Sequence, residues 1–172
     1  GTSTSASLRQ AAARRNDSGG IVDDVLQREL TEWASRRGRT GVGLTPGIVV
    51  PTSAGELERN GVRRIYHAAV VQPLPVKQAY IVTPLAIMSA VGAAFALVAS
   101  ENASGNRPLA SICFPLFGAG RGGLAARDAA GLLWSPLLRE MRRHPGVQVH
   151  VATRSDEGAA AFSAAVTETE PD

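Results

Sequence analysis

Apolar and polar residues follow two different periods along this chain, and these periods predict its secondary structure. Apolar residues recur at steps of three and four over Ile21–Arg37, which predicts an amphipathic helix. Further helices are expected over Leu8–Arg15, from about Thr83 to Ser100, over Ala125–Arg143 and over Asp156–Thr167. Short apolar runs predict strands at Gly47–Pro51, Val62–Val71, Leu109–Phe117 and Val147–Thr153. Strands that alternate with helices in this way predict an α/β fold with a mostly parallel sheet and helices on both faces.

Two of the expected helices carry unusual residues. The helix over Ala125–Arg143 contains Pro136, which predicts a kink or a second helix capped by Ser135. The helix from about Thr83 lies in the uncharged stretch Gln78–Ser100, which is long enough to raise the question of a membrane span. Alanine, glycine, serine and threonine dilute its hydrophobicity, so we expect the fully buried helix of a soluble protein and no membrane partner.

That apolar helix is expected to turn one face inward. Steps of three and four residues predict this face to carry Leu85, Met88, Gly92, Phe95 and Ala99.

Composition narrows the classes of protein and of site. The 172 residues suit one domain, and the formal net charge is +3 with a single lysine. The arginine clusters are not interleaved with aromatic residues, which does not favour a nucleic-acid partner. Cys113 is the only cysteine and lies in an apolar run, so we expect a small core residue in a reduced, cytoplasmic protein. The three histidines are scattered, and no metal site is expected.

The stretch Leu109–Arg127 carries the clearest chemical signal. An apolar strand opens into Gly118-Ala119-Gly120-Arg121-Gly122-Gly123, and a helical pattern follows. Glycines let the backbone approach a ligand closely, and a helix start offers free N–H groups, so this order predicts an anion pocket that suits phosphate. The same glycines also fit a flexible surface turn.

Two common phosphate-binding motifs do not fit. Gly118, Gly120 and Gly123 satisfy G-x-G-x-x-G, but a dinucleotide-binding motif belongs on the first strand of its fold and has an acidic residue about 20 positions later. Here one strand follows, and Asp156 comes too late. A P-loop needs Gly-Lys-Ser/Thr after its glycines, and the sequence has none there.

Four stretches, taken together and in order, resemble the macrodomain family of ADP-ribose binders. They are Gly19–Asp23, which is similar to the family's G-G-G-V-D, then Gly47–Leu57, Val62–Ala69 and Ser111–Gly123. The resemblance covers roughly Gly19–Thr153 and implies a three-layer α/β/α sandwich. The family usually has strands, an adenine-binding Asp and an Asn-rich motif ahead of its first glycine loop. The sequence ahead of Gly19 shows no such strand or motif.

The resemblance also implies the ligand and the residues that contact it. Two glycine-rich loops would clasp the diphosphate and distal ribose of ADP-ribose. The implied ligand-binding residues are Gly19, Gly20, Ile21, Val22, Phe117, Gly118, Ala119, Gly120, Arg121, Gly122 and Gly123. No cofactor is implied, and further domains of a longer parent protein are compatible with the match. On this basis we expect residues 1–18 to be a flexible or short helical segment, residues 19–167 the macrodomain-like domain, and residues 168–172 an acidic tail.

Three functions stay open from the sequence. The first is a module that binds ADP-ribose, a related nucleotide diphosphate or an ADP-ribosylated protein. The second is an ADP-ribosyl hydrolase, in which Asp23 would position or activate water, although an Asp in a first helical turn also stabilises the helix dipole without catalysis. The third is a degenerate domain that serves protein contacts or a sensor. His67 is an acid–base candidate, but a core or edge histidine bonded to the backbone is the expected role.

Overall fold

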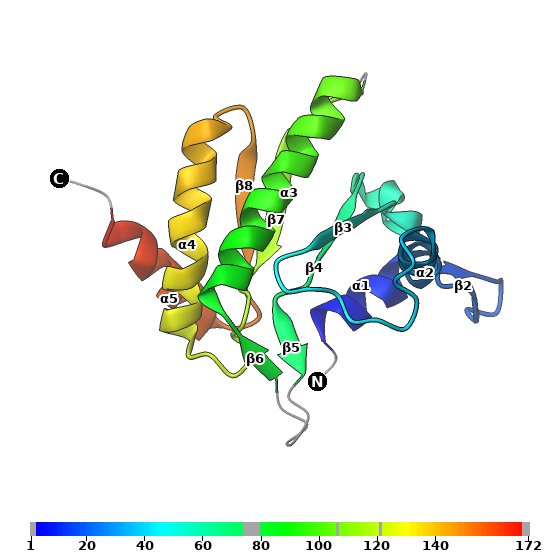
Figure 1. Cartoon of the computed structure of the whole chain (residues 1–172), viewed down its shortest axis with the longest axis horizontal. Coiled ribbons are helices and arrows are strands. Elements are labelled where there is room, and N and C mark those ends of the chain that lie inside the picture. Colours follow the sequence, from blue (N-terminus) through cyan, green and yellow to red (C-terminus); the bar gives the residue numbers. More distant parts are fainter. Residues whose placement is uncertain (1–2, 74–79, 106, 121, 170–172) are drawn as a thin grey trace. The chain divides into compact units, whose positions relative to one another are not determined.

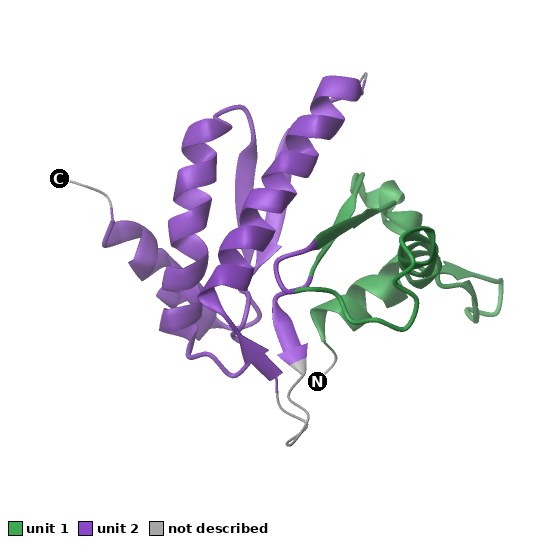
Figure 2. Cartoon of the chain, viewed as in Figure 1, with its two compact units in different colours: residues 1–45, 49–68 green, residues 46–48, 69–172 purple. Residues whose placement is uncertain are grey.

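The structure is a computed structural model that describes residues 3–73, 80–105, 107–120 and 122–169. The chain divides into two compact units, which Figure 2 shows in different colours. The first unit holds residues 1–45 and 49–68, and the second holds residues 46–48 and 69–172.

Helices and strands alternate along both units (Figure 1). The first unit contains α1 (Thr4–Ala12), β1 (Arg14–Arg15), β2 (Ile21–Asp23), α2 (Val25–Arg36), β3 (Val49–Thr52), the 3₁₀-helix η1 (Gly55–Asn60) and β4 (Ile65–Ala68). The second contains β5 (Val71–Pro73), β6 (Tyr80–Val82), α3 (Pro84–Ser104), β7 (Ser111–Pro115), α4 (Ala126–Arg143), β8 (Gln148–Ala152) and α5 (Asp156–Thr167). The last helix has the bounds that the sequence predicts.

The strand pairing differs from the expected mostly parallel sheet. Among the described residues the strands form four pairs, of which β7–β8 is parallel and β1–β2, β3–β4 and β5–β6 are antiparallel. The connection decides the direction. α4 carries the chain from β7 back to the start of β8, as a parallel pair requires, whereas the short link between β1 and β2 allows only an antiparallel return.

The first unit has a small apolar core of its own. Ala12 of α1, Leu26 of α2 and Ile65 of β4 are buried together. Leu8 and Leu57 pack against this cluster, so α1 and η1 both contribute to it. The core therefore joins elements that lie far apart in the sequence.

The start of α2 differs from the prediction. The helix expected from Ile21 begins at Val25, because β2 pairs with β1 before it. Asp24 is the N-cap, and its side chain accepts a hydrogen bond from a backbone amide of the first turn. Asp23 thus lies ahead of the helix rather than in its first turn, and the dipole role expected of Asp23 falls to Asp24.

One aromatic ring lies at the centre of the second unit. Phe95 of α3 is fully buried and stacks on Phe114 of β7, with ring centroids 6.0 Å apart. Its other neighbour is His144, just after α4, whose ring centroid is 5.4 Å away. Leu133 and Leu137 of α4 are also fully buried. Phe95 therefore ties together α3, β7 and the end of α4.

The helix α3 is buried on one face, so the expected full burial is wrong. Its buried residues are Ala86, Ile87, Ala90, Val91, Ala94, Phe95 and Val98. Leu85 and Met88, which the sequence places on the inward face, are instead 70% and 39% exposed. Almost every position of this helix is apolar, so the spacing predicted a helix without determining which face turns inward.

In the part of the chain that the structure describes, α3 is also the one helix long and apolar enough to cross a membrane. Its mean hydropathy over the best window is 1.6, and 39% of that window is buried. A core helix meets the same criteria of length and composition, so this property gives only weak support for a membrane span.

The helix α4 runs unbroken from Ala126 to Arg143 through Pro136. A second helix capped by Ser135 is therefore not formed. Pro136 is fully buried, as are Leu133, three residues before it, and Leu137, the next residue. Burial of this face offsets the hydrogen bond that proline cannot donate.

Cys113 is exposed, so its expected place in the core is wrong. Successive side chains of a strand point to opposite faces. Its neighbour Phe114 is buried, which leaves Cys113 on the other face of the β7–β8 pair together with Ser111 and His150, both exposed. The apolar run predicted the strand correctly but not that only one of its faces is covered.

We predict that Phe95→Ala lowers the free energy of unfolding by about 3–5 kcal/mol, because it leaves a cavity beside Phe114. Urea unfolding followed by circular dichroism measures this loss. The control is Leu85→Ala in the same helix, which should cost about 0.5 kcal/mol or less because Leu85 is 70% exposed. Equal losses in the two variants would contradict the central role of Phe95.

Candidate functional site

The glycine loop predicted to bind phosphate is the connection between β7 and α4, residues 116–125, here called the second glycine loop. Gly118 and Gly123 have φ angles of +85° and +70°, a region that glycine adopts without strain. The Leu124 amide donates to the Gly118 carbonyl at 3.1 Å, and the Gly123 amide donates to the Gly120 carbonyl at the same distance. These two hydrogen bonds and two φ angles define a turn among the described residues on either side of position 121.

The second glycine loop folds back so closely that Gly122 leaves no room for a side chain, while the φ of +85° at Gly118 disfavours one. A Cβ on Gly122 would lie 2.5 Å from a methyl carbon of Val82 and 2.8 Å from the Gly118 carbonyl oxygen. A Cβ on Gly118 would lie 2.6 Å from a methyl carbon of Leu124. Gly120 differs, because nothing lies within 4 Å of the Cβ that it lacks. Gly118 and Gly122 shape the loop, and Gly120 lies on its open side.

The backbone amides of this loop are the groups that would bind an anion. Within the described part of the chain, the amides of Gly118, Ala119 and Gly120 have no hydrogen-bond acceptor. The N-cap of α4 is Ala125, whose side chain makes no capping bond. Successive unpaired amides next to a helix start form an anion-binding arrangement. Arg121, the one charged candidate in this loop, lies outside the described residues.

The corresponding amides of the first glycine loop, residues 16–20, are already bonded. The Gly19 amide donates to the Asn16 carbonyl at 2.9 Å, and the Gly20 amide donates to Asn16 Oδ1 at 2.8 Å. Arg15 donates in turn to the Gly19 carbonyl at 2.8 Å. This loop is closed on itself by Asn16, so the structure distinguishes two loops that the sequence analysis treated alike.

The apolar candidates take different surroundings. Ile21 and Val22 are 42% and 60% exposed at the end of the first glycine loop. Phe117 meets the ring of Phe114 edge-on, with centroids 6.2 Å apart. Ile21 and Val22 therefore offer apolar surface, while Phe117 is packed against the core of the second unit.

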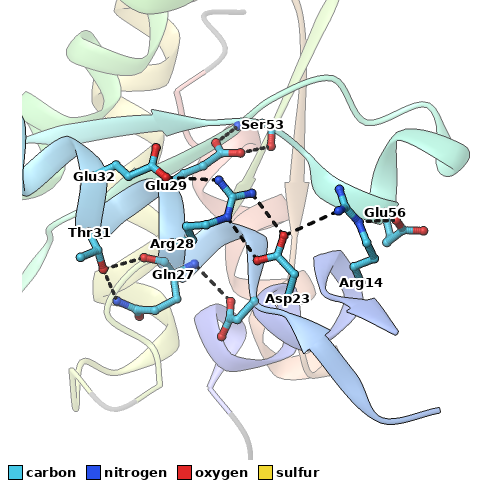
Figure 3. A network of polar contacts seen from close by, with 10 residues as sticks. Arg14, Asp23, Gln27, Arg28, Glu29, Thr31, Glu32, Ser53 and Glu56 are labelled. Atoms are coloured by element: carbon cyan, nitrogen blue, oxygen red, sulfur yellow. Dashed lines mark hydrogen bonds and ion pairs between the residues drawn. The ribbon is translucent and has the colours of Figure 1, made fainter. Parts of the chain in front are cut away.

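Asp23, the catalytic candidate, is held by arginines (Figure 3). Its two carboxylate oxygens accept from Arg28 at 3.2 and 3.3 Å. Arg14 lies 4.0 Å from the same carboxylate and 3.9 Å from Glu56. Arg28 also reaches Glu32 at 3.3 Å, and its bonds to Asp23 and Glu32 raise the pKa of the Arg28 guanidinium. The Asp23 carboxylate is thus one member of a chain of ion pairs.

Asp24, the next residue, has a different role. It caps α2 through the Gln27 amide at 3.1 Å and accepts a hydrogen bond from Arg9 Nε at 3.0 Å. The hydrogen bond from Arg9 holds the pKa of the Asp24 carboxyl below its ordinary value, and burial opposes this shift. The two adjacent aspartates therefore serve a salt bridge and a helix cap.

His67 lies in β4 opposite β3, near a second polar pair. Its Nε2 lies 3.0 Å from the hydroxyl of Thr52, so its partner is a side chain and not the expected backbone group. Glu29 accepts from the amide and the hydroxyl of Ser53 at 2.7 and 2.6 Å, which ties α2 to the end of β3 (Figure 3). Burial lowers the pKa of the His67 imidazole, and the negative charge of Glu29 partly opposes this. A half-buried neutral histidine fits a structural role.

Comparisons with known proteins identify the fold. Neither a family model nor a curated protein matches the sequence. Solved structures do match: the Oceanobacillus iheyensis macrodomain with ADP aligns with a TM-score of 0.74 at 19% identity, over 98% of this chain and 76% of that chain. The chain has the macrodomain fold.

A second macrodomain gives the same result with a weaker score. The Trypanosoma brucei macrodomain in complex with ADP-ribose aligns with a TM-score of 0.57 at 17% identity, over 92% of this chain and 60% of that chain. Both the predicted α/β class and the resemblance to macrodomains are confirmed by these matches. The domain boundaries at residues 18 and 167 stay a prediction.

From the sequence, residues 16–20 are expected to be a loop with side chains able to cap, whereas the residues that anchor α2 to β3 were missed. Asn16 gave a usable signal, because an Asn a few residues ahead of glycines commonly bonds to the backbone of a turn. Glu29 and Ser53 gave none, since 24 positions separate them and only the fold brings them together.

We predict that acidification destabilises the first unit through His67. Its pKa in the folded protein lies below the ordinary 6.5, so the unfolded chain takes up the proton more readily. Stability is therefore full above pH 6.5 and is lost as the pH falls through the folded pKa. Urea unfolding at pH 7.5 and pH 5.0 measures this loss.

His67→Gln should flatten that pH dependence. The matched control, His150→Gln, changes an exposed histidine of β8 and should leave the dependence in place. An unaltered dependence in His67→Gln would show that other groups are responsible.

Proposed function

We propose that this macrodomain binds ADP-ribose, or a related nucleotide diphosphate, through the second glycine loop. The structural neighbours support the ligand class, because one was solved with ADP and another with ADP-ribose. The loop supports the place. It follows a strand of a parallel pair and precedes a helix, which is where α/β folds bind phosphates.

A single observation carries the proposal. The amides of Gly118, Ala119 and Gly120 are successive donors without an acceptor among the described residues. A diphosphate needs several donors at close range without intervening bulk, and these three amides meet that need. Close packing at Gly122 and the positive φ angle of Gly118 suit a turn whose backbone can approach a diphosphate closely.

The other candidates take secondary roles in this proposal. Gly122 and Gly123 belong to the same turn, and Arg121 would add a positive charge to it. Phe117 would act through the packing of the loop, since its ring lies against Phe114.

The first glycine loop enters the proposal on the family resemblance alone. Its amides at Gly19 and Gly20 already donate to Asn16, and the side chains of Ile21 and Val22 are exposed.

We favour a non-catalytic binder over a hydrolase. Both oxygens of Asp23 accept a hydrogen bond from Arg28, so an ion pair accounts for the position of this carboxylate without a catalytic role. Arg14 adds a second positive charge at 4.0 Å. Hydrolysis would have to use the acceptor sites of Asp23 that the two arginines leave open.

We expect calorimetry to detect ADP-ribose binding to the wild-type chain, and Gly120→Glu to weaken it at least tenfold, about 1.4 kcal/mol. The new side chain enters open space, so the fold should survive while its carboxylate repels the diphosphate. Gly146→Glu is the matched control, because that glycine also has nothing within 4 Å of its missing Cβ. Absence of binding at millimolar ADP-ribose would contradict the proposal and favour the third function, a degenerate domain that serves protein contacts or a sensor.

We predict that Asp23→Ala keeps ADP-ribose affinity within about threefold, since the ion pair and not the ligand holds this carboxylate. The wild-type chain, incubated with a protein carrying ADP-ribose on an acidic side chain, should release none. Release by the wild type that stops in Asp23→Ala would establish the hydrolase. Circular dichroism of the variant checks that its fold is retained.

A further inference from the structure

A groove in the second unit lies between α3 and α4, away from the second glycine loop in the sequence. We call it the α3–α4 groove, and its volume is about 580 Å³. Its floor is one side of α3, formed by Leu85, Met88, Ser89, Gly92, Ala93 and Ala96. The two helices lie side by side in Figure 1.

The floor of this groove is apolar although it is open to solvent. Leu85 is 70% exposed and Met88 is 39% exposed. No charged residue occurs from Pro84 to Ser100, whereas the solvent side of a surface helix is normally polar. Gly92 and Ala96 keep the floor low, so another backbone could approach it closely. Methionine adapts its shape to a partner more readily than branched residues do.

The wall of the groove comes from the end of α4 and is positively charged. Glu140 is 4% exposed, and its carboxylate accepts from Arg139 at 3.0 Å and Arg143 at 3.4 Å. His144 Nε2 lies 3.8 Å from the other oxygen, and its ring is held in place by Phe95. Two guanidiniums share one buried carboxylate, so positive charge remains in excess.

The two arginines of this wall are also accessible. The side chains of Arg139 and Arg143 are 44% and 65% exposed. Glu140 anchors both of them at the rim, which reduces the rotamer freedom that they would lose on binding a carboxylate.

We propose that the α3–α4 groove docks an acidic amphipathic helix of a partner protein. The apolar stripe of that helix would lie on the floor between Leu85 and Ala96, and its flanking Asp or Glu residues would face Arg139 and Arg143. This is the helix-in-groove mode of recognition, in which apolar anchors give affinity and flanking charges set orientation. The inference is independent of the proposed ligand of the second glycine loop.

Two other occupants fit the groove less well. A second copy of the chain related by a twofold axis would bring the same arginines toward one another without new carboxylates. An anionic membrane would supply negative charge, but a planar surface would leave a concave groove unfilled. The experiments below also test a second copy and a membrane as occupants of the groove.

The test uses a displayed library of 18-residue amphipathic helices with varied apolar positions and flanks of either Glu or Lys. Selection with the purified full chain should enrich Glu-flanked helices at least tenfold over Lys-flanked ones. Ala96→Glu should abolish this enrichment, because it places a carboxylate on the floor at an exposed position. Ala160→Glu, at an exposed position of α5, is its control and should bind like the wild type.

A second pair of variants keeps the test decisive if Ala96→Glu folds poorly. Arg143→Gln removes one charge of the wall and should weaken a selected helix by up to about fivefold, the upper limit for one exposed ion pair. Arg142→Gln changes a neighbouring exposed arginine that does not line the groove and should have no effect. ADP-ribose affinity should be equal in all four variants.

Several results would overturn the proposal. Equal enrichment of the two charge classes, or no enrichment of either, would exclude an acidic helix as the occupant. A dimer in sedimentation velocity that Ala96→Glu dissociates would assign the groove to a second copy. Binding to phosphatidylserine vesicles that Ala96→Glu removes would assign it to a membrane.

Discussion

The stacking of Phe95 between Phe114 and His144 is the interaction on which the second unit depends. Phe114 is the penultimate residue of β7, and His144 follows the last residue of α4. The second glycine loop joins the end of β7 to the start of α4. The Phe95 ring therefore packs against both elements that the loop connects. The backbone of the loop then packs closely at Gly122, where it leaves no room for a Cβ, and turns at Gly118 with a φ of +85°. The site is therefore built from the core outward.

Much of the architecture could be predicted from local patterns. The bounds of α5 and the positions of α3, β7 and β8 are predicted by periodicity. The position of the second glycine loop is predicted by its glycine-rich sequence. What could not be predicted has a common cause. The inward face of α3 and the exposure of Cys113 both depend on which surfaces pack against each other in the folded chain, and neighbouring residues in the sequence do not determine this. The fold outcome rests on structural neighbours, since the sequence alone carries a resemblance but no detectable family match.

Within the candidate site, the sequence named the right loops but could not rank them. Asn16 accepts hydrogen bonds from the Gly20 amide through its side chain and from the Gly19 amide through its carbonyl. These two amides of the first loop are therefore already paired within the loop. Asp23 illustrates the same limit. Its position in the motif suggests catalysis, yet Arg28 lies five residues further on, where only the actual start of α2 brings it within reach. Charge partners decide what a carboxylate can do, and they become visible only once the helix boundary is known.

A loop that recognises its ligand by backbone amides has an unusual tolerance for evolutionary change. Every residue but proline supplies the same N–H group, so most positions of such a loop can drift without loss of donors. The exceptions are positions where sterics and not chemistry restrict the residue, as at Gly118 and Gly122. Mutational scanning of this segment with folding as the readout would then record a steep barrier at these two glycines and little effect at Gly120, where the missing Cβ faces open space. The pattern of tolerated substitutions would report on the shape of the backbone rather than on the identity of the ligand.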